Sequence, residues 1–364
     1  MKIALAWLDP SDPTDRRVAE SLTRALRTLG HDVIWVGPRR RTGERATARV
    51  AGARLFRVSG GSRALLELHR RERVDVWHCH AFARSHEAFS RAAARGRWPL
   101  VVTLHLILKD YLPSIGGARG LRALVAPADF IVAVSRSESE ELAALCPEAR
   151  RRSRVVYNGV PRADGPPAPT PIRTPYALTV ARLAPYKGID LLLMAFARLR
   201  LERPDLKLVV CGRDQLGGAM PAFARRLGLS DAVVFTGELP WPRVRALLGG
   251  CAFFALASRR ENLPAVVLEA MAEGKAVAAF AAGGVPELVR HGEEGLLARP
   301  GDVAALGRAM LALARDPARR ARLGAAGRAR SRIFSWERAA REYVRLYVRA
   351  SAKRRRAAGT RSKK

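Results

Sequence analysis

Residues 3–36 read IALAWLDPSDPTDRRVAESLTRALRTLGHDVIWV, and this stretch indicates the fold class of the chain. The apolar run Ile3–Leu8 predicts a buried strand, Gly30 is a typical helix stop, and Val33–Val36 predicts the next strand. The unit is therefore strand–helix–strand, which is typical of a parallel, doubly wound α/β sheet. The intervening helix has one apolar face, formed by Val18, Leu22, Leu26 and Leu29.

The same alternation continues to the middle of the chain, pauses once and then restarts. The pause is the proline-rich segment Ala163–Pro175 (ADGPPAPTPIRTP), which predicts a linker because proline interrupts helices and central strands. Strands are predicted before it at 55–58, 74–77, 100–104, 130–134 and 155–157, and after it at 177–180, 206–211, 233–235, 252–256 and 276–280.

This organisation predicts two Rossmann-like domains that face a central cleft. We expect an N-terminal domain over 1–165 and a C-terminal domain over 166–334. A terminal helix is predicted over 335–350, and the family resemblance described below implies that it packs back on the N-terminal domain. Residues 351–364 (SAKRRRAAGTRSKK) combine seven cations with no acid and no large apolar residue, which predicts a disordered tail.

The amino-acid composition restricts the kinds of protein that this chain can be. A chain of 364 residues that is 48% hydrophobic can bury two cores, which excludes a disordered protein. No signal peptide or membrane-spanning run is evident, and four scattered cysteines favour reduced thiols, so we expect a cytoplasmic protein. The net charge of +32 is mostly due to arginine and is spread along the chain, so coding bias explains it as well as a binding surface does.

Polar residues stand directly after many of the predicted strands, where open parallel sheets bind ligands. Cations suit phosphate groups and carboxylates suit sugar hydroxyls, so the pattern predicts a phosphorylated, hydroxyl-rich ligand such as a nucleotide sugar. The residues are Arg182, Lys187, Gly212, Ser258, Glu261, Asn262, Gly283 and Gly284 in the second half, and His105 in the first.

The sharpest local signal is residues 261–277, ENLPAVVLEAMAEGKAV. It resembles the E-x7-E segment of retaining, GT-B-fold glycosyltransferases of family 4. Residues 179–196 (TVARLAPYKGIDLLLMAF) and 283–297 (GGVPELVRHGEEGLL) resemble that family's Arg…Lys-Gly and Gly-Gly-x-Pro-Glu segments. The likeness covers nearly the whole chain and is strongest from 176 to 300.

The resemblance implies a role for each candidate. Glu269 would accept hydrogen bonds from the donor's ribose, and Glu261 would lie nearer the sugar. Arg182 and Lys187 would bind the diphosphate and stabilise the charge on the leaving nucleotide. In many other transferases a metal ion stabilises this charge. Together with His105, which would contact the donor sugar, these two cations and Glu261 are the catalytic candidates. The other donor-binding candidates are Asn262, Gly212, Ser258, Gly283 and Gly284.

We expect no metal and no cofactor besides the donor substrate. His78 and His80 share one face of a strand without an evident third ligand, which favours a structural role. The family's glycine-rich loop after the first strand is replaced here by the glycine-free residues 9–17. Arg16 or Arg17 would contact phosphate there, or would simply open the first helix. Residues 106–120 are the expected acceptor loop, whose apolar side chains would contact a lipid tail or pack.

The resemblance thus implies a retaining transferase that moves a sugar from a nucleotide-diphosphate sugar to an acceptor hydroxyl in polysaccharide, lipopolysaccharide or glycolipid synthesis. No carboxylate is assignable as a nucleophile, so we name none. One alternative is another GT-B chemistry, such as 2-epimerisation of a nucleotide sugar. A second is a non-enzymatic binder of nucleic acid, which no aromatic-interleaved basic motif supports. The basic tail leaves docking to the inner face of the cytoplasmic membrane open.

Overall fold

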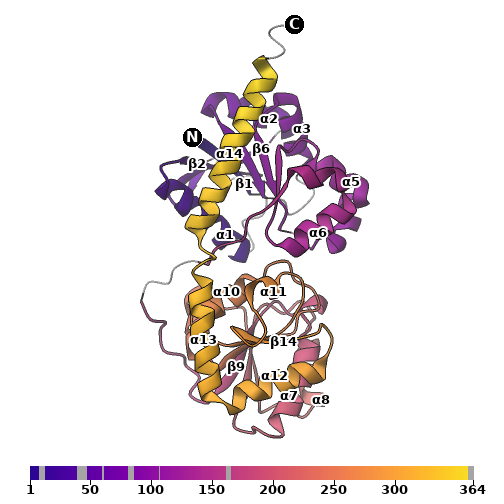
Figure 1. Cartoon of the computed structure of the whole chain (residues 1–364), viewed down its shortest axis with the longest axis vertical. Coiled ribbons are helices and arrows are strands. Elements are labelled where there is room, and N and C mark those ends of the chain that lie inside the picture. The colour runs from indigo at the N-terminus through magenta and orange to yellow at the C-terminus, as the bar shows by residue number, and fades with distance from the viewer. Residues whose placement is uncertain are drawn as a thin grey trace. The chain divides into compact units, whose positions relative to one another are not determined.

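The structure is a computed structural model that describes residues 1–7, 13–38, 47–59, 61–80, 86–105, 107–160 and 165–359. The chain forms two compact units. The first contains Met1–Gly159 and the segment from Trp336 onward, and the second is Val160–Ser335. Both are parallel α/β units, so the predicted fold class is confirmed (Figure 1).

The first unit has an eight-stranded sheet of order β3-β4-β2-β1-β5-β6-β7-β8, parallel except for the β3–β4 pair. Its strands are β1 Lys2–Trp7, β2 Asp32–Pro38, β3 Thr47–Val50, β4 Ala53–Val58, β5 Val76–His80, β6 Leu100–Thr103, β7 Phe130–Ala133 and β8 Ser153–Val155. Its helices are α1 Pro13–Thr28, α2 Gly61–Glu72, α3 His86–Gly96, α4 Leu108–Tyr111, α5 Gly117–Val125, α6 Arg136–Leu145 and α14 Trp336–Gly359, with 3₁₀ turns η1 Leu112–Ile115 and η2 Pro147–Arg152.

Alternate residues of each strand in the first unit face two separate cores, as the period of two along a strand requires. Ile3 and Leu5 of β1 pack with α1 and α14, whereas Ala4 and Ala6 pack on the other face. The helix α14 therefore covers one face of this sheet beside α1 (Figure 1).

The second unit has a six-stranded parallel sheet of order β11-β10-β9-β12-β13-β14. Its strands are β9 Tyr176–Val180, β10 Lys207–Cys211, β11 Val233–Gly237, β12 Phe253–Leu256, β13 Val277–Phe280 and β14 Gly295–Ala298. Its helices are α7 Ile189–Arg200, α8 Ala219–Arg226, α9 Trp241–Gly250, α10 Ala265–Ala272, α11 Val285–Leu288, α12 Val303–Arg315 and α13 Pro317–Ser331, with the 3₁₀ turn η3 Pro185–Lys187.

The expected linker differs from the observed chain path. Residues 165–175 form neither helix nor strand, but they pack on the second unit: Thr170 accepts a hydrogen bond from Tyr176 Oη at 3.1 Å, and Gly249 lies against Pro167. The division between the units therefore falls at Gly159–Val160, ahead of the proline-rich segment. Pro167 and Thr170 of this segment lie against Gly249 and Gly250 of α9.

The predicted disordered tail is wrong for residues 351–359, because α14 continues to Gly359. The reason is a buried carboxylate. Asp129 is 2% exposed. It accepts a hydrogen bond from Arg354 Nε at 2.8 Å and forms an ion pair with Lys353 at 3.3 Å. Arginine, lysine and alanine are also good helix formers, so the helix continues once its cations are anchored. Residues 360–364 lie outside the described part of the chain.

Candidate functional site

The carboxyl edge of the second sheet brings the predicted donor residues into neighbouring loops. The loops after β9 and β12 are adjacent, because these two strands pair, and the loop after β13 is next to that of β12. Arg182 and Lys187 follow β9, Glu261 follows β12, and Gly283 follows β13. This edge is where an open parallel sheet binds its ligand.

The centre of this edge is an ion pair between Lys187 and Glu261. Lys187 Nζ donates to Glu261 Oε1 at 2.6 Å, and the two side chains are 17% and 6% exposed. A charge-assisted hydrogen bond of this length in a largely water-excluded place is strong. The pair joins two of the predicted catalytic residues across adjacent loops.

Arg182 lies on the same loop and is exposed. Its Nη2 donates to the hydroxyl of Tyr186 at 2.9 Å, and the Tyr186 ring centroid lies 5.2 Å from Lys187 Nζ. Tyr186 therefore contacts both predicted diphosphate-binding cations. The sequence reasoning missed it, because a tyrosine between proline and lysine carries no local signal of such a contact.

Arg259 holds the same turn to the loop after β12, and it was also missed. Its backbone N–H donates to Tyr186 O at 2.9 Å, and its Nη1 donates to Pro185 O at 2.8 Å. The guanidinium also binds both carboxylate oxygens of Asp190, at 2.8 and 2.6 Å, which holds the pKa of that carboxyl below its usual range. This bidentate geometry fixes orientation as well as distance.

The predicted glycines pack loops against each other. At Gly283, with φ +52°, a Cβ would lie 1.7 Å from Glu261 O, and the Gly284 N–H donates to Asn262 O at 3.0 Å. At Gly212, a Cβ would lie 2.0 Å from Ala181 O, and its N–H donates to Gly237 O at 2.9 Å. The N–H groups of Gly212 and Gly284 are thus engaged within the protein. Close approach of backbone is the reason for glycine here.

The two glutamates occupy the places that their spacing predicts. Glu261 lies in the loop before α10, and Glu269 lies on the helix with 6% exposure. Pro264 is the residue immediately before the helix, one position ahead of the predicted first turn. Ser258, 1% exposed, has a hydroxyl without a hydrogen-bond partner among the residues that the structure describes.

In the first unit, the predicted site residue His105 has a φ of +49°. A positive φ is uncommon for a residue with a side chain, although histidine adopts it more often than most residues do. His105 Nε2 and Nδ1 of the buried His80 are 2.8 Å apart, and the rings stack with centroids separated by 5.1 Å. Burial lowers the pKa of His105 to about 3, so its imidazole is neutral in the working range.

A second polar group lies beneath these histidines and reaches α14. His78 Nδ1 is 2.7 Å from Tyr347 Oη, and His78 Nε2 is 2.7 Å from Thr103 Oγ1. Thr103 Oγ1 is also 3.2 Å from Tyr343 Oη. Burial holds the pKa of His78 well below its ordinary value. Both His78 and His80 lie within β5 rather than beyond the strand predicted at 74–77, which agrees with a structural role for His78.

The expected acceptor loop is mostly packed. Leu108 is fully buried, and Leu112 and Ile115 pack on the same core, whereas Tyr111 is 37% exposed. Leu106 lies outside the described residues. In the loop after β1, Asp9–Asp12 also lie outside them, and Arg16 belongs to α1, where its Nε donates to Glu20 Oε1 at 2.8 Å.

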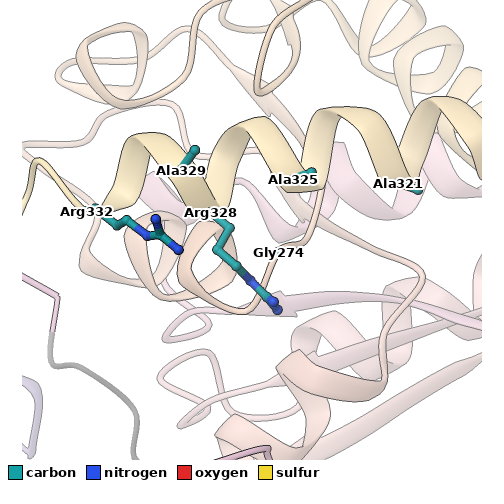
Figure 2. Close-up of a pocket in the computed structure, with 6 residues that line it drawn as sticks. All are labelled: Gly274, Ala321, Ala325, Arg328, Ala329 and Arg332. Carbon is teal, nitrogen blue, oxygen red and sulfur yellow. The ribbon is translucent and has the colours of Figure 1, made fainter.

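The described residues were also searched for membrane-spanning helices, metal sites, disulfides and pockets. They contain no helix long and apolar enough to cross a bilayer, and no cluster of three metal-ligating side chains. All four cysteines are unpaired and buried. The second unit also has a hollow of about 330 Å³ whose lining includes none of the predicted site residues. Arg328, which lines it, donates to Glu273 O at 3.0 Å, and Figure 2 shows the lining residues. The lining of the hollow is Gly274, Ala321, Ala325, Arg328, Ala329 and Arg332.

Solved structures share this fold. Sucrose-phosphate synthase from Thermosynechococcus elongatus has a TM-score of 0.82 at 22% identity, with 97% of this chain and 100% of that chain covered. HepE of Anabaena, in complex with UDP and glucose, has a TM-score of 0.77 at 22% identity over 95% and 98% of the two chains. The two Rossmann-like units therefore place the chain in the GT-B class.

Sequence comparison identifies the family. Residues 16–164 match the model for Glycosyltransferase Family 4, and residues 167–330 match that for Glycosyl transferases group 1. D-inositol 3-phosphate glycosyltransferase of Streptomyces avermitilis is 31% identical over 316 residues, which are 79% of this chain and 68% of that protein. Glycogen synthase of Mycobacterium tuberculosis is 30% identical over 288 residues, 76% and 69% of the two chains. The chain belongs to glycosyltransferase family 4 and is a glycosyltransferase.

Proposed function

We propose that this glycosyltransferase uses a nucleotide-diphosphate sugar as donor and retains its anomeric configuration in the product. The observation that carries the proposal is the Lys187–Glu261 ion pair of 2.6 Å, with Arg182 on the same loop, at the carboxyl edge of the second sheet. Two cations and a carboxylate suit a ligand with phosphates and hydroxyls. The UDP, glucose and UDP-glucose held by HepE support the choice of donor class.

In the proposed reaction, the bond between the sugar's anomeric carbon and the phosphate oxygen breaks. The acceptor oxygen forms the new bond on the same face, and its proton passes to the departing phosphate oxygen. Arg182 and Lys187 stabilise the negative charge that develops on the diphosphate. In other enzymes a bound divalent cation gives this stabilisation. We infer that transfer is therefore independent of divalent metal.

The remaining contacts are proposed from their positions. Glu269, buried on α10, would accept hydrogen bonds from the ribose, and the Ser258 hydroxyl would gain in the donor the partner it lacks. Asn262 and Gly283 would shape the wall beside the sugar, because Gly283 approaches Glu261 closely. His105 would contact the donor sugar as a neutral imidazole.

We place the enzyme in the cytoplasm, in the synthesis of cell-envelope polysaccharide, lipopolysaccharide or glycolipid. If the acceptor is linked to a lipid, the enzyme would have to act at the inner face of the cytoplasmic membrane. The end of α14 supports this, since Arg355 and Arg356 are exposed there and basic residues are attracted to anionic lipid. The named substrates of the relatives, inositol phosphate and glycogen among them, differ too widely to select one acceptor.

The test is a screen of UDP- and GDP-sugars with hydroxyl acceptors in buffer that contains EDTA. We expect release of nucleoside diphosphate that depends on the acceptor and on Lys187, with a product of unchanged anomeric configuration by NMR. Activity that is lost in EDTA and restored by Mg²⁺ or Mn²⁺ would contradict metal independence. Inversion at C2 of the sugar without any acceptor would indicate that the protein is an epimerase. Thermal stabilisation by nucleic acid, but not by nucleotides, would indicate that it is a non-enzymatic nucleic-acid binder.

A further inference from the structure

The short turn that carries the two cations is fixed from the neighbouring strand's loop. The Arg259 backbone N–H donates to Tyr186 O at 2.9 Å, and its guanidinium donates to Pro185 O at 2.8 Å. Next to the turn, a Cβ on Gly188 would lie 2.0 Å from Ala257 O, so the turn lies directly against the strand end. The backbone of Tyr186 thus has little room to move.

From this fixed backbone, the Tyr186 side chain touches both cations. Its hydroxyl accepts the Nη2–H of Arg182 at 2.9 Å. Its ring centroid lies 5.2 Å from Lys187 Nζ, within the range of a cation–π attraction. Lys187 has a second partner in Glu261.

Arg182 differs from Lys187 in its exposure. It lies at the protein surface, where a long side chain samples many rotamers, and ordering those rotamers opposes binding. A hydrogen bond that the guanidinium donates to Tyr186, whose backbone is held in place, restricts the guanidinium before the ligand arrives. Preorganisation of this kind lowers the cost of binding and of stabilising the transition state.

We propose that Tyr186 is a positioning residue that holds Arg182 for the donor diphosphate through its hydroxyl, and that its ring supports Lys187. The proposal rests on the proposed function, because it takes the diphosphate as the ligand of Arg182 and Lys187. It adds a residue that acts on the ligand through Arg182 and has no assigned contact with the ligand itself.

The test is a double-mutant cycle of Tyr186→Phe and Arg182→Ala, with calorimetric binding of UDP or GDP, whichever the wild type binds more tightly. Tyr186→Phe keeps the ring and removes only the hydroxyl. We expect it to weaken binding by about 3- to 10-fold, the scale of one hydrogen bond, and to lower kcat more than it changes KM. In the Arg182→Ala background the same change is expected to have no effect on binding.

The matched control is Arg198→Ala, which removes an exposed arginine of α7. In that background Tyr186→Phe should weaken binding as it does in the wild type. Tyr186→Leu, which removes ring and hydroxyl, should couple with both Arg182→Ala and Lys187→Ala. Unfolding temperatures of each variant serve to show that a loss of binding is not a loss of folding.

The outcomes separate the two proposals. If Tyr186→Phe has no effect, or an equal effect with and without Arg182, the positioning role is overturned while the diphosphate site stands. If the wild type binds no nucleoside diphosphate, or if Arg182→Ala and Lys187→Ala both bind the nucleotide and turn over the donor as the wild type does, the proposed function itself fails.

Discussion

Lys187 has to serve two partners at once in the proposed site. In the structure it pairs with Glu261, and both side chains are largely buried, so removal of either leaves an uncompensated charge in a water-poor place. The donor diphosphate would add a second anion next to the same ammonium group. We therefore expect Lys187 to affect the transition state more than the ground state.

We predict that Lys187→Ala and Arg182→Ala each lower turnover by about 10²- to 10³-fold, the scale for one stabiliser of developing charge. Glu269→Ala should instead mainly weaken binding of the free nucleoside diphosphate, as measured by calorimetry. Lys207→Ala is the matched control, because Lys207 begins β10 at the opposite edge of the sheet. Folded variants with wild-type turnover would remove both cations from the site.

The buried histidines predict how stability depends on pH. Burial depresses the pKa of His105 to about 3 and that of His78 well below its ordinary value, whereas the unfolded chain binds these protons near pH 6.5. The unfolded state therefore takes up more protons as the pH falls, so these groups destabilise the fold progressively below pH 6.5. Stability from this source is complete above that value.

We predict that His105→Asn reduces the fall in unfolding temperature between pH 7.5 and pH 5.5. Asparagine suits the positive φ at this position, so the backbone should be retained. The measurement is thermal unfolding of both proteins at the two pH values. An unchanged difference between the two temperatures would mean that His105 titrates normally in the folded state.

At the residue scale, the positions of the candidate site residues could be predicted, because the sequence shows where the buried strands of a parallel sheet end. Arg182, Lys187, Glu261 and Glu269 all lie where the spacing placed them relative to strands and helix. Tyr186 could not be predicted, since its contacts come from how a turn is held against another loop. That information is long-range and leaves no local pattern.

At the scale of elements, α14 shows how a partner far away in the sequence decides a local structure. Its last turns are basic and would be disordered alone, yet Asp129 fixes them through Arg354 and Lys353. Asp129 also accepts the Leu100 N–H at 3.1 Å, so one carboxylate joins the start of β6 to the helix. The composition of the tail carried no hint of this anchor.

We predict that Asp129→Ala lowers the free energy of unfolding by about 1–3 kcal/mol, because it strips a buried N–H and two cations of their partner. Chemical denaturation measures the change, and hydrogen exchange should show faster exchange in residues 352–358. Glu342→Ala is the control on the same helix, since its ion pair with Arg345 is exposed and contributes about 0.5 kcal/mol or less. Equal effects of the two variants would show that Asp129 does not anchor the helix.

The strands were predictable to within a few residues, with two exceptions. β3 was missed because it is a short edge strand, and β14 because Gly295–Ala298 is a short run between glycine- and proline-containing turns. Neither carries a predicted site residue. The other strands could be predicted because the central strands, which are buried on both faces, form nearly continuous apolar runs.

At the scale of the whole molecule, charge is the property with a testable consequence. The net charge is +32, and the exposed Arg355 and Arg356 concentrate part of it at the end of α14. Each basic residue near an anionic bilayer contributes about 1 kcal/mol. Two are too few to hold the protein alone, so any docking would depend on the overall charge as well.

We predict that the protein binds vesicles rich in phosphatidylserine at low salt and is released at high salt, because these attractions are screened within a Debye length. Arg355→Gln with Arg356→Gln should weaken binding and leave activity on a water-soluble acceptor intact. Arg225→Gln with Arg226→Gln, an equal change of charge on α8, is the control. Equal vesicle binding by the two double variants would remove the helix end as a docking element.

The course of the chain through the two units has a consequence for protein synthesis. The first unit begins at Met1 but is completed only by α14, whose Tyr343 and Tyr347 bind Thr103 and His78 inside it. A ribosome must therefore translate the entire second unit before the first can close its core. Val160–Ser335, which is continuous, has all its strands as soon as it emerges. We expect the second unit to reach its native state first, the reverse of the usual N-to-C order, so the nascent first unit is the one that needs protection by chaperones.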